Sequence, residues 1–320
     1  MIEYIDVFNG DADGITALHQ WRLAYPAEST LITGVKRDIQ LLENIPAKNN
    51  QELTVFDISL KSNRKFLDDH LRLKSRITWF DHHQPGTPLP EHQYLTLHLD
   101  QTPNTCTSNI VNRLLGGKYL KWAVVGAFGD SLYELGVELA KKAGCTESER
   151  QELEELGTLI NYNAYGDSLE DLHFQPLQVY QEMQDFVDPS GFCQSSQIFK
   201  GLRLGFKDDF SHLVDIRMDD FESNGAIAYL PDEKWARRLI GTYANQLSSQ
   251  SPNRPHAILR KKRDGWLVSV RAPELNPVGA DVLCSSFETG GGRPKAAGIN
   301  MLPGDQLSKF IDQFRCHFIQ

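Results

Sequence analysis

The feature that most constrains this chain is the alternation of short apolar runs with helical patterns over its first 130 residues. The apolar runs predict strands at Tyr4–Phe8, Thr30–Val35, Leu53–Ile58 and Ile77–Phe80. The stretches between them predict helices at Ile15–Tyr25, near Ile39–Leu42 and over Asn63–Leu73. Strands that are buried on both faces are apolar along their whole length, so this pattern predicts an α/β fold with a parallel sheet covered by helices on both faces.

Beyond this alternation the pattern changes twice. Residues from about Leu120 to Asn161 are mostly helical in pattern, and Asp188–Gly191 lies in a polar connector and predicts a turn. A second α/β pattern predicts strands at Ala226–Leu230, Ala257–Lys261, Trp266–Arg271 and Ile299–Leu302, with helices over Asp232–Leu247, Gly279–Phe287 and Asp305–Phe318 and a glycine-rich turn at 290–292. We therefore expect an N-terminal domain at 1–185, a helical connector at 186–223 and a smaller α/β domain at 224–320.

The charge and the cysteines limit the partners and the compartment that we expect. The chain has 33 Lys and Arg against 42 Asp and Glu, a net charge of −9, which is the wrong sign for a protein that tracks long duplex nucleic acid. The first residues lack the cations of a signal peptide, and no apolar run is long enough to cross a membrane. The five scattered cysteines show no zinc-site or disulfide spacing. We expect a cytoplasmic protein with no membrane partner.

Acidic and imidazole side chains follow the predicted strands. They are Asp11 and Asp13, Asp57, the run Asp81-His82-His83, and Asp130 after a run of small residues. In a parallel α/β sheet, ligands bind beyond the carboxyl ends of the strands, so we expect these side chains to share one site. Taken alone, Asp13 is as well explained as a helix N-cap followed by a turn glycine. The repeated pattern favours a site.

Clustered carboxylates repel one another unless cations neutralise them or their pKa values rise. Two bound divalent ions would neutralise this negative charge, and such pairs of ions are typical of enzymes that catalyse phosphoryl chemistry. A mixed shell of carboxylate oxygens and imidazole nitrogen favours Mn²⁺ over Ca²⁺, and the lack of thiolates argues against structural zinc.

The order and spacing of these residues resemble the DHH phosphoesterase superfamily, which includes nanoRNase-like and RecJ-like phosphodiesterases. The C-terminal segment Gly290-Gly291-Gly292-Arg293-Pro294-Lys295-Ala296-Ala297-Gly298 is similar to the glycine-rich element of the DHHA1 domain that accompanies it. Arg271 resembles the strand-borne arginine of that domain. The two matches cover most of the chain apart from the connector.

The resemblance implies a role for each matching residue. Asp11 and Asp57 would bind one Mn²⁺, while Asp13, Asp57, His82 and Asp130 would bind a second. Asp81 would orient the turn or an imidazole, and His83 would face the phosphate or a metal-bound water. The substrate would be held by Arg271, Gly290, Gly291, Gly292, Arg293 and Lys295.

The chain departs from the family pattern at three positions. Val7 stands where many relatives have a metal-ligating histidine, and Asn9 stands where the RecJ branch carries an acid. The remaining ligand of the first metal is therefore open between Asn9, water and His83. Arg293 replaces the usual histidine of the glycine-rich element, which suggests a grip on phosphate.

The resemblance implies an Mn²⁺-dependent phosphodiesterase. The acidic charge favours short 5′-phosphorylated oligoribonucleotides, above all linear dinucleotides such as pGpG or pApA, which would be hydrolysed to nucleoside monophosphates. Such an enzyme would clear the linear products of cyclic-di-GMP signalling. The alternatives are a cyclic-dinucleotide phosphodiesterase, a bisphosphonucleoside phosphatase, and a nucleotide-binding regulator without activity. Base preference and a homodimer are left open.

Overall fold

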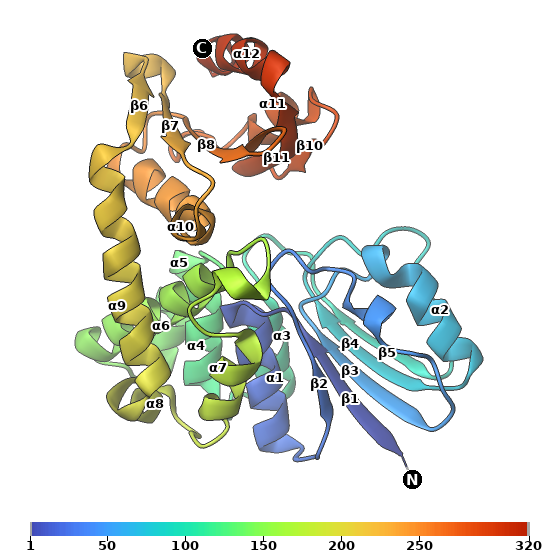
Figure 1. Cartoon of the computed structure of the whole chain (residues 1–320). Helices are drawn as coiled ribbons and strands as arrows, with labels where there is room; N and C mark the ends of the chain where they lie inside the picture. The colour runs from blue at the N-terminus through green and yellow to red at the C-terminus, as the bar shows by residue number, and fades with distance from the viewer. Residues whose placement is uncertain (1, 319–320) are drawn as a thin grey trace. The chain divides into compact units, whose positions relative to one another are not determined.

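The parallel sheet that the apolar runs predict is present. In the computed structural model, which describes residues 2–318, five parallel strands lie in the order β2-β1-β3-β4-β5 (Figure 1). Their bounds are β1 Glu3–Phe8, β2 Thr30–Ile32, β3 Gln51–Phe56, β4 Arg76–Asp81 and β5 Leu95–Leu99. The edge strand β5 was not predicted, because most of its residues are only partly buried and its apolar pattern is weak.

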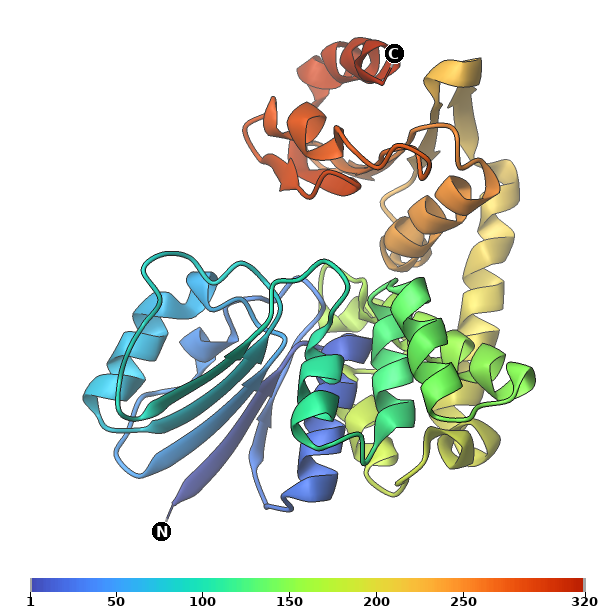
Figure 2. The same cartoon turned by 180° about the vertical axis from the view of Figure 1, so that it is seen from behind.

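Helices cover both faces of this sheet, as predicted. On one face, Val55 and Trp79 pack in a core with Leu67 of α2. On the other face, the ring of Phe80 lies 5.0 Å from that of Trp21 in α1. Figures 1 and 2 show α2 and α1 on opposite sides of the sheet. The helices of this part are α1 Ala12–Ala24, α2 Arg64–Arg72, α3 Thr107–Leu114, α4 Leu120–Gly129, α5 Tyr133–Lys142, α6 Glu147–Ala164, α7 Pro176–Met183, α8 Pro189–Ser195 and α9 Gln197–Ser211.

Three local predictions in this part are corrected. Helix α1 begins at Ala12 rather than Ile15, because Asp11 caps it. The helix expected near Ile39–Leu42 is a single 3₁₀ turn at Leu41–Asn44. The turn expected at Asp188–Gly191 is the start of α8, where Asp188 caps the helix and Pro189 occupies the first helical position that proline favours.

The second sheet has six strands in the order β10-β11-β9-β8-β7-β6, of which only the β7–β8 pair is parallel. Its core includes Val268 and Val270 of β9 and Phe310 and Phe314 of α12. The elements are β6 Arg217–Asp220, β7 Ala226–Leu230, α10 Lys234–Gln250, β8 His256–Lys262, β9 Gly265–Arg271, α11 Ala280–Ser285, β10 Gly290–Gly292, β11 Ala296–Pro303 and α12 Leu307–His317.

Two predictions for this sheet are corrected. Strand β6 lies in the expected connector and was missed because its side chains are mostly exposed. The glycine run expected as a turn is the edge strand β10, and the tight connection follows it, where Arg293 and Ala296 exchange backbone hydrogen bonds.

The chain divides into two compact units, Met1–Gly205 (unit 1) and Phe206–Gln320 (unit 2), with the boundary inside α9. The residues expected as a connector contribute α8 to unit 1 and β6 to unit 2. Among residues 2–318, no helix combines the length and hydropathy that a membrane span requires.

Candidate metal centre

The first carboxylates are placed by the start of α1. Asp11 is the N-cap: its Oδ1 accepts hydrogen bonds of 3.1 Å from the backbone N–H groups of Asp13 and Gly14. Gly14 allows this tight turn, since a Cβ there would lie 2.4 Å from the carbonyl oxygen of Asn9. The helix therefore starts directly after β1, and Asp11 and Asp13 both lie at the carboxyl edge of the sheet.

Asp13 does not cap its own helix but caps α3. Its two carboxylate oxygens accept hydrogen bonds from the backbone N–H groups of Thr107, at 2.8 Å, and Ser108, at 2.7 Å. The position before that helix is Cys106, whose side chain makes no capping bond. A carboxylate at a helix N-terminus is favoured by the unpaired amides and the helix dipole. This contact fixes the direction of the buried Asp13 side chain.

Asp57 follows β3 in a left-handed backbone conformation, with φ of +58°. Such a conformation costs roughly 1–2 kcal/mol in most residues and less in Asp or Asn. The backbone N–H of Asp57 donates to the carbonyl of Phe80 at 2.9 Å, and Thr107 Oγ1 donates to Asp57 Oδ1 at 3.1 Å. Strained backbone held by its surroundings is common where a side chain must be aimed at a site.

His82 directs its Nε2 atom toward the buried carboxylates. Its Nδ1 lies 3.0 Å from the carbonyl oxygen of Thr105, which can only accept, so Nδ1 carries a proton and Nε2 is the nitrogen that the ring would offer to a metal. That Nε2 lies 3.4 Å from Asp57 Oδ1, 3.8 Å from Asp130 Oδ2 and 4.0 Å from Asp13 Oδ2. A backbone carbonyl behind the imidazole is the usual support of a metal-ligating histidine.

The carboxylates around His82 are buried close to one another, which shifts the pKa values of the group. Burial, followed by the repulsion of neighbouring carboxylates, raises the pKa of Asp13 well above its ordinary value, and raises that of Asp57 for the same reasons. Burial works to lower the pKa of His82, but Asp57, Asp130 and Asp13 raise it to about 10. The three carboxylates thus favour a positive charge at this place, here a proton on the imidazole. Their oxygens and the imidazole nitrogen together form a ligand set that suits a divalent cation.

Asp81 and His83 form a second layer beside this group. Asp81 Oδ1 accepts hydrogen bonds from the backbone N–H groups of His82 and His83, and from His83 Nδ1 at 2.7 Å. The His83 side chain is 40% exposed, and its Nδ1 lies 3.8 Å from Asp57 Oδ1. Ligand atoms of Asp57, His82 and His83 lie within 4.8 Å of one another. Asp81 therefore orients the turn and one imidazole.

Sequence reasoning missed Lys36 and Asn161. The Lys36 ammonium donates to Asp11 Oδ2 at 2.5 Å and to Asn161 Oδ1 at 2.8 Å, and lies 3.9 Å from Asp130 Oδ1. Burial works to raise the pKa of Asp11, but Lys36 lowers it overall. The signal for Lys36 was its place just after the predicted strand Thr30–Val35; Asn161 gave none, because it lies inside the helix α6.

The candidate residues of unit 2 gather at one end of its sheet. Arg271 ends β9 opposite Ala296, and the backbone N–H of Ala272 donates to the Lys295 carbonyl. The Arg271 guanidinium donates to Asn245 Oδ1 at 2.9 Å and to Ser269 Oγ at 3.1 Å, while Arg293 and Lys295 are exposed. Gly290, Gly291 and Gly292 form β10 beside them.

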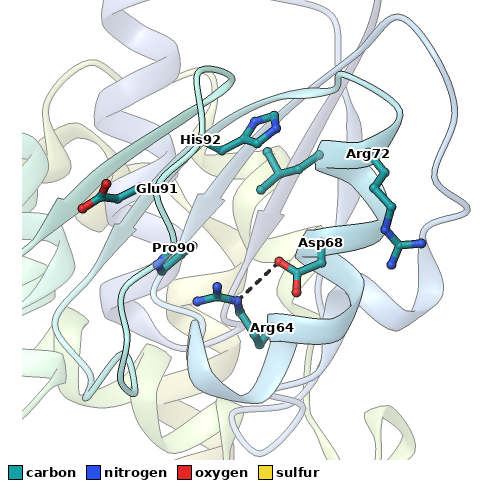
Figure 3. Close-up of a pocket in the computed structure, with 7 residues that line it drawn as sticks. Arg64, Asp68, Arg72, Pro90, Glu91 and His92 are labelled. Carbon is teal, nitrogen blue, oxygen red and sulfur yellow. Dashed lines mark ion pairs between the residues drawn. The ribbon is translucent and has the colours of Figure 1, made fainter.

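A cavity of about 370 Å³ lies elsewhere in unit 1, beside α2 (Figure 3). In Figure 3, Arg64 forms an ion pair of 3.4 Å with Asp68 at its rim. Its lining residues are Arg64, Asp68, Leu71, Arg72, Pro90, Glu91 and His92. This lining contains none of the acidic and imidazole residues of the candidate centre.

No family model matches the chain, and no curated protein matches it in sequence. Solved structures do match it in three dimensions. A manganese-bound RecJ exonuclease superposes with a TM-score of 0.62 at 16% identity, covering 99% of this chain and 90% of its own.

Two further structures are similar over their length. A pGpG-specific phosphodiesterase, PggH from Vibrio cholerae, has a TM-score of 0.57 at 13% identity, with 99% of each chain covered. An exopolyphosphatase-related protein from Bacteroides fragilis has a TM-score of 0.55 at 15% identity, covering 98% of this chain and 91% of its own. The chain therefore has the fold of the DHH phosphoesterases, which the resemblance of its motifs predicted.

Proposed function

We propose that this chain is a divalent-metal-dependent phosphodiesterase, with Mn²⁺ as the preferred ion. Its substrates are short 5′-phosphorylated oligoribonucleotides, above all linear dinucleotides such as pGpG or pApA, and its products are nucleoside monophosphates.

The observation that carries this proposal is the surroundings of His82. Its Nδ1–H is held by the Thr105 carbonyl, and its Nε2 faces oxygens of Asp13, Asp57 and Asp130. One imidazole nitrogen and three carboxylates, each from a different element, are a ligand set for a hard to borderline divalent ion. Such an ion, when bound, lowers the pKa of water and stabilises negative charge on a phosphate.

The chain's own residues supply the rest of the chemistry. Hydrogen bonds from the amides of α3 hold the Asp13 carboxylate in place, and the left-handed backbone at Asp57 directs its carboxylate. Both carboxylates are therefore oriented toward the candidate metal centre before substrate binds. His83 is oriented by Asp81 and partly exposed, so it is placed to hydrogen-bond a phosphate oxygen. Burial works to lower the pKa of His83, but Asp81 raises it, which favours the protonated, donating form.

Two observations support a short substrate. The net charge of −9 opposes the approach of a long polyanion. The similar fold of a pGpG-specific phosphodiesterase agrees with a dinucleotide, although RecJ exonuclease has this fold too. In unit 2, exposed Arg293 and Lys295 and the strand-end Arg271 are the groups that we expect to bind the terminal phosphate.

A turnover assay with four substrates tests the proposal. The full chain, stripped of metal and resupplied with Mn²⁺, Mg²⁺ or neither, is incubated with pGpG, cyclic-di-GMP, a long single-stranded oligonucleotide and polyphosphate. We expect Mn²⁺-dependent release of GMP from pGpG at a kcat/KM well above that for the other three. Preference for the long strand or for the cyclic dinucleotide would contradict the substrate assignment. No turnover of any substrate with either metal would contradict an enzymatic role.

A further inference from the structure

A lysine occupies the other half of the candidate centre. Lys36 is anchored at its backbone, because its N–H donates to the carbonyl of Ala164 at 3.0 Å and its own carbonyl accepts from Asn9 Nδ2 at 3.2 Å. Its side chain is 23% exposed, and the ammonium lies among oxygens of Asp11, Asn161 and Asp130. The ammonium thus lies where several hydrogen-bond acceptors converge, which is the position that a bound metal cation would take.

Two of the residues considered for the first metal, Asp11 and Asn9, already have hydrogen-bond partners within the protein. Asp11 Oδ1 accepts the two capping hydrogen bonds of α1, and Asp11 Oδ2 accepts from Lys36. Asn9 uses its Oδ1 to accept from the backbone N–H of Asp11, and its Nδ2 for the Lys36 carbonyl. A divalent ion on Asp11 Oδ2 would stand within a few ångströms of the Lys36 ammonium, and the two like charges would repel each other.

Asp130 lies between the two halves of the centre. Its Oδ1 is 3.9 Å from the Lys36 ammonium and its Oδ2 is 3.8 Å from His82 Nε2. The His82 half presents an imidazole nitrogen and carboxylate oxygens, whereas the Lys36 half is neutralised by a side chain of the protein. The same carboxylate can therefore face a bound ion on one side and a fixed ammonium on the other.

We propose that this chain binds one divalent ion, at Asp13, Asp57, His82 and Asp130, and that the Lys36 ammonium takes the place of the first ion of a two-metal centre. This inference rests on the proposed function. Asp11 then serves as the counter-ion that positions Lys36, and Asn161 as its second acceptor. The ammonium supplies a positive charge at that place without any exchange of ions.

The metal stoichiometry tests this assignment independently of activity. Full-length wild-type protein and the Lys36→Met variant are stripped with chelator and dialysed against excess Mn²⁺, and bound Mn²⁺ is counted by elemental analysis. Electron paramagnetic resonance then shows whether the bound ions are isolated or magnetically coupled. We expect one isolated Mn²⁺ per wild-type chain, and two coupled ions per Lys36→Met chain, because removal of the ammonium frees Asp11 Oδ2.

Matched variants keep the result interpretable. Lys65→Met, an exposed lysine of α2, should bind one ion, and Lys36→Gln, which can still hydrogen-bond Asn161, replaces Lys36→Met if that variant fails to fold by circular dichroism. Two ions in the wild type would overturn the proposal, as would one ion in both wild type and the folded Lys36 variant. No bound Mn²⁺ in any of these proteins would instead contradict the proposed function.

Discussion

The two units build their candidate sites from opposite charges and from different sheets. In unit 1, all five strands are parallel. Asp11 and Asp57 follow β1 and β3, and the Asp81-His82-His83 run begins at the last residue of the neighbouring strand β4. In unit 2, the β7–β8 pair is parallel and the other strand pairs are antiparallel, and the candidate residues are Arg271, Arg293 and Lys295.

The difference shows how topology decides which side chains can form a site. Parallel strands all end at one edge, so short aspartates from distant parts of the chain meet there with little reach. Antiparallel strands end alternately at opposite edges, so fewer strand ends meet at either one. Unit 2 instead uses a strand end and one tight turn, and its long cationic side chains extend from them.

The largest effect that we expect is the loss of a metal ligand in unit 1. Asp57→Asn should lower kcat for pGpG roughly 10³-fold or more, because metal stabilisation of transition-state charge is worth several kcal/mol. Asparagine tolerates the left-handed backbone at this position, so the fold should persist. His82→Ala should behave alike. GMP release with Mn²⁺ is measured alongside thermal melting.

Asp185→Asn, an exposed aspartate of the same unit, is the control for Asp57→Asn and should keep full activity. If a folded Asp57→Asn or His82→Ala protein turned over pGpG at nearly the wild-type rate, the assignment of the centre would be wrong.

A smaller effect is expected from the cations of unit 2. Arg293→Ala should lower kcat/KM for pGpG by ten- to a hundredfold, since one charge-assisted hydrogen bond contributes about 1.5–3 kcal/mol. A small synthetic phosphodiester, which has no terminal phosphate, should be hydrolysed at the wild-type rate. Arg271→Ala should show the same selectivity and also destabilise unit 2, because Arg271 binds Asn245 and Ser269.

The control for the arginine variants is Arg263→Ala, an exposed arginine in the β8–β9 turn. Equal losses on both substrates would mean that Arg293 stabilises the fold or contacts the reacting phosphate. The idea that unit 2 binds the terminal phosphate while unit 1 binds the metal would then be wrong.

Acid should lower the folding stability of both units, because each contains a buried histidine. Burial lowers the pKa of His19 in unit 1 and of His256 in unit 2 to about 4. The unfolded chain binds these protons from about pH 6.5 and the folded chain only near 4, so stability is complete above 6.5 and falls as the pH drops toward 4. For the nearly inaccessible His19, the loss from pH 7 to pH 5 is on the order of 2 kcal/mol.

Hydrogen exchange at pH 7 and pH 5 separates the two contributions, because it reports on each unit. His19→Gln should reduce the acid sensitivity of α1 and leave that of β8 unchanged, and His256→Gln should do the reverse. Identical acid profiles in the wild type and both variants would contradict the prediction.

The smallest effect concerns a single helix end. Thr146 begins α6 with a capping box: its Oγ1 accepts from the backbone N–H of Glu149 at 3.2 Å, and Glu149 Oε2 accepts from the Thr146 N–H at 2.8 Å. Thr146→Ala should cost about 1 kcal/mol of unfolding free energy in unit 1. Urea titration measures it.

Ser249→Ala, on the exposed part of α10 in unit 2, is the comparison and should have no cost, because alanine has the higher helix propensity. An unchanged unfolding midpoint for Thr146→Ala would show that tertiary packing alone holds α6 in place.

The fold was predictable where burial was strong and uniform. Strand β7 is wholly apolar and almost wholly buried, and β3 begins with Gln51 and Glu52 but ends in a buried run, so both patterns are visible in the sequence. The edge strands β5 and β6 are partly exposed and carry mixed side chains, so pairing with a neighbour, rather than composition, makes them strands. The same holds for the glycines of β10, whose composition indicates a turn.

The candidate site also has features that local sequence pattern predicts and features that depend on packing. The order of residues was enough to predict which acidic and imidazole side chains lie at strand ends, because strand ends depend on local patterns of apolar residues. Three contacts became visible only in the folded chain: Asp13 caps α3, the Thr105 carbonyl binds Nδ1 of His82, and Lys36 binds Asp11. These contacts join residues 94, 23 and 25 positions apart, and local pattern cannot specify them because they depend on how whole elements pack.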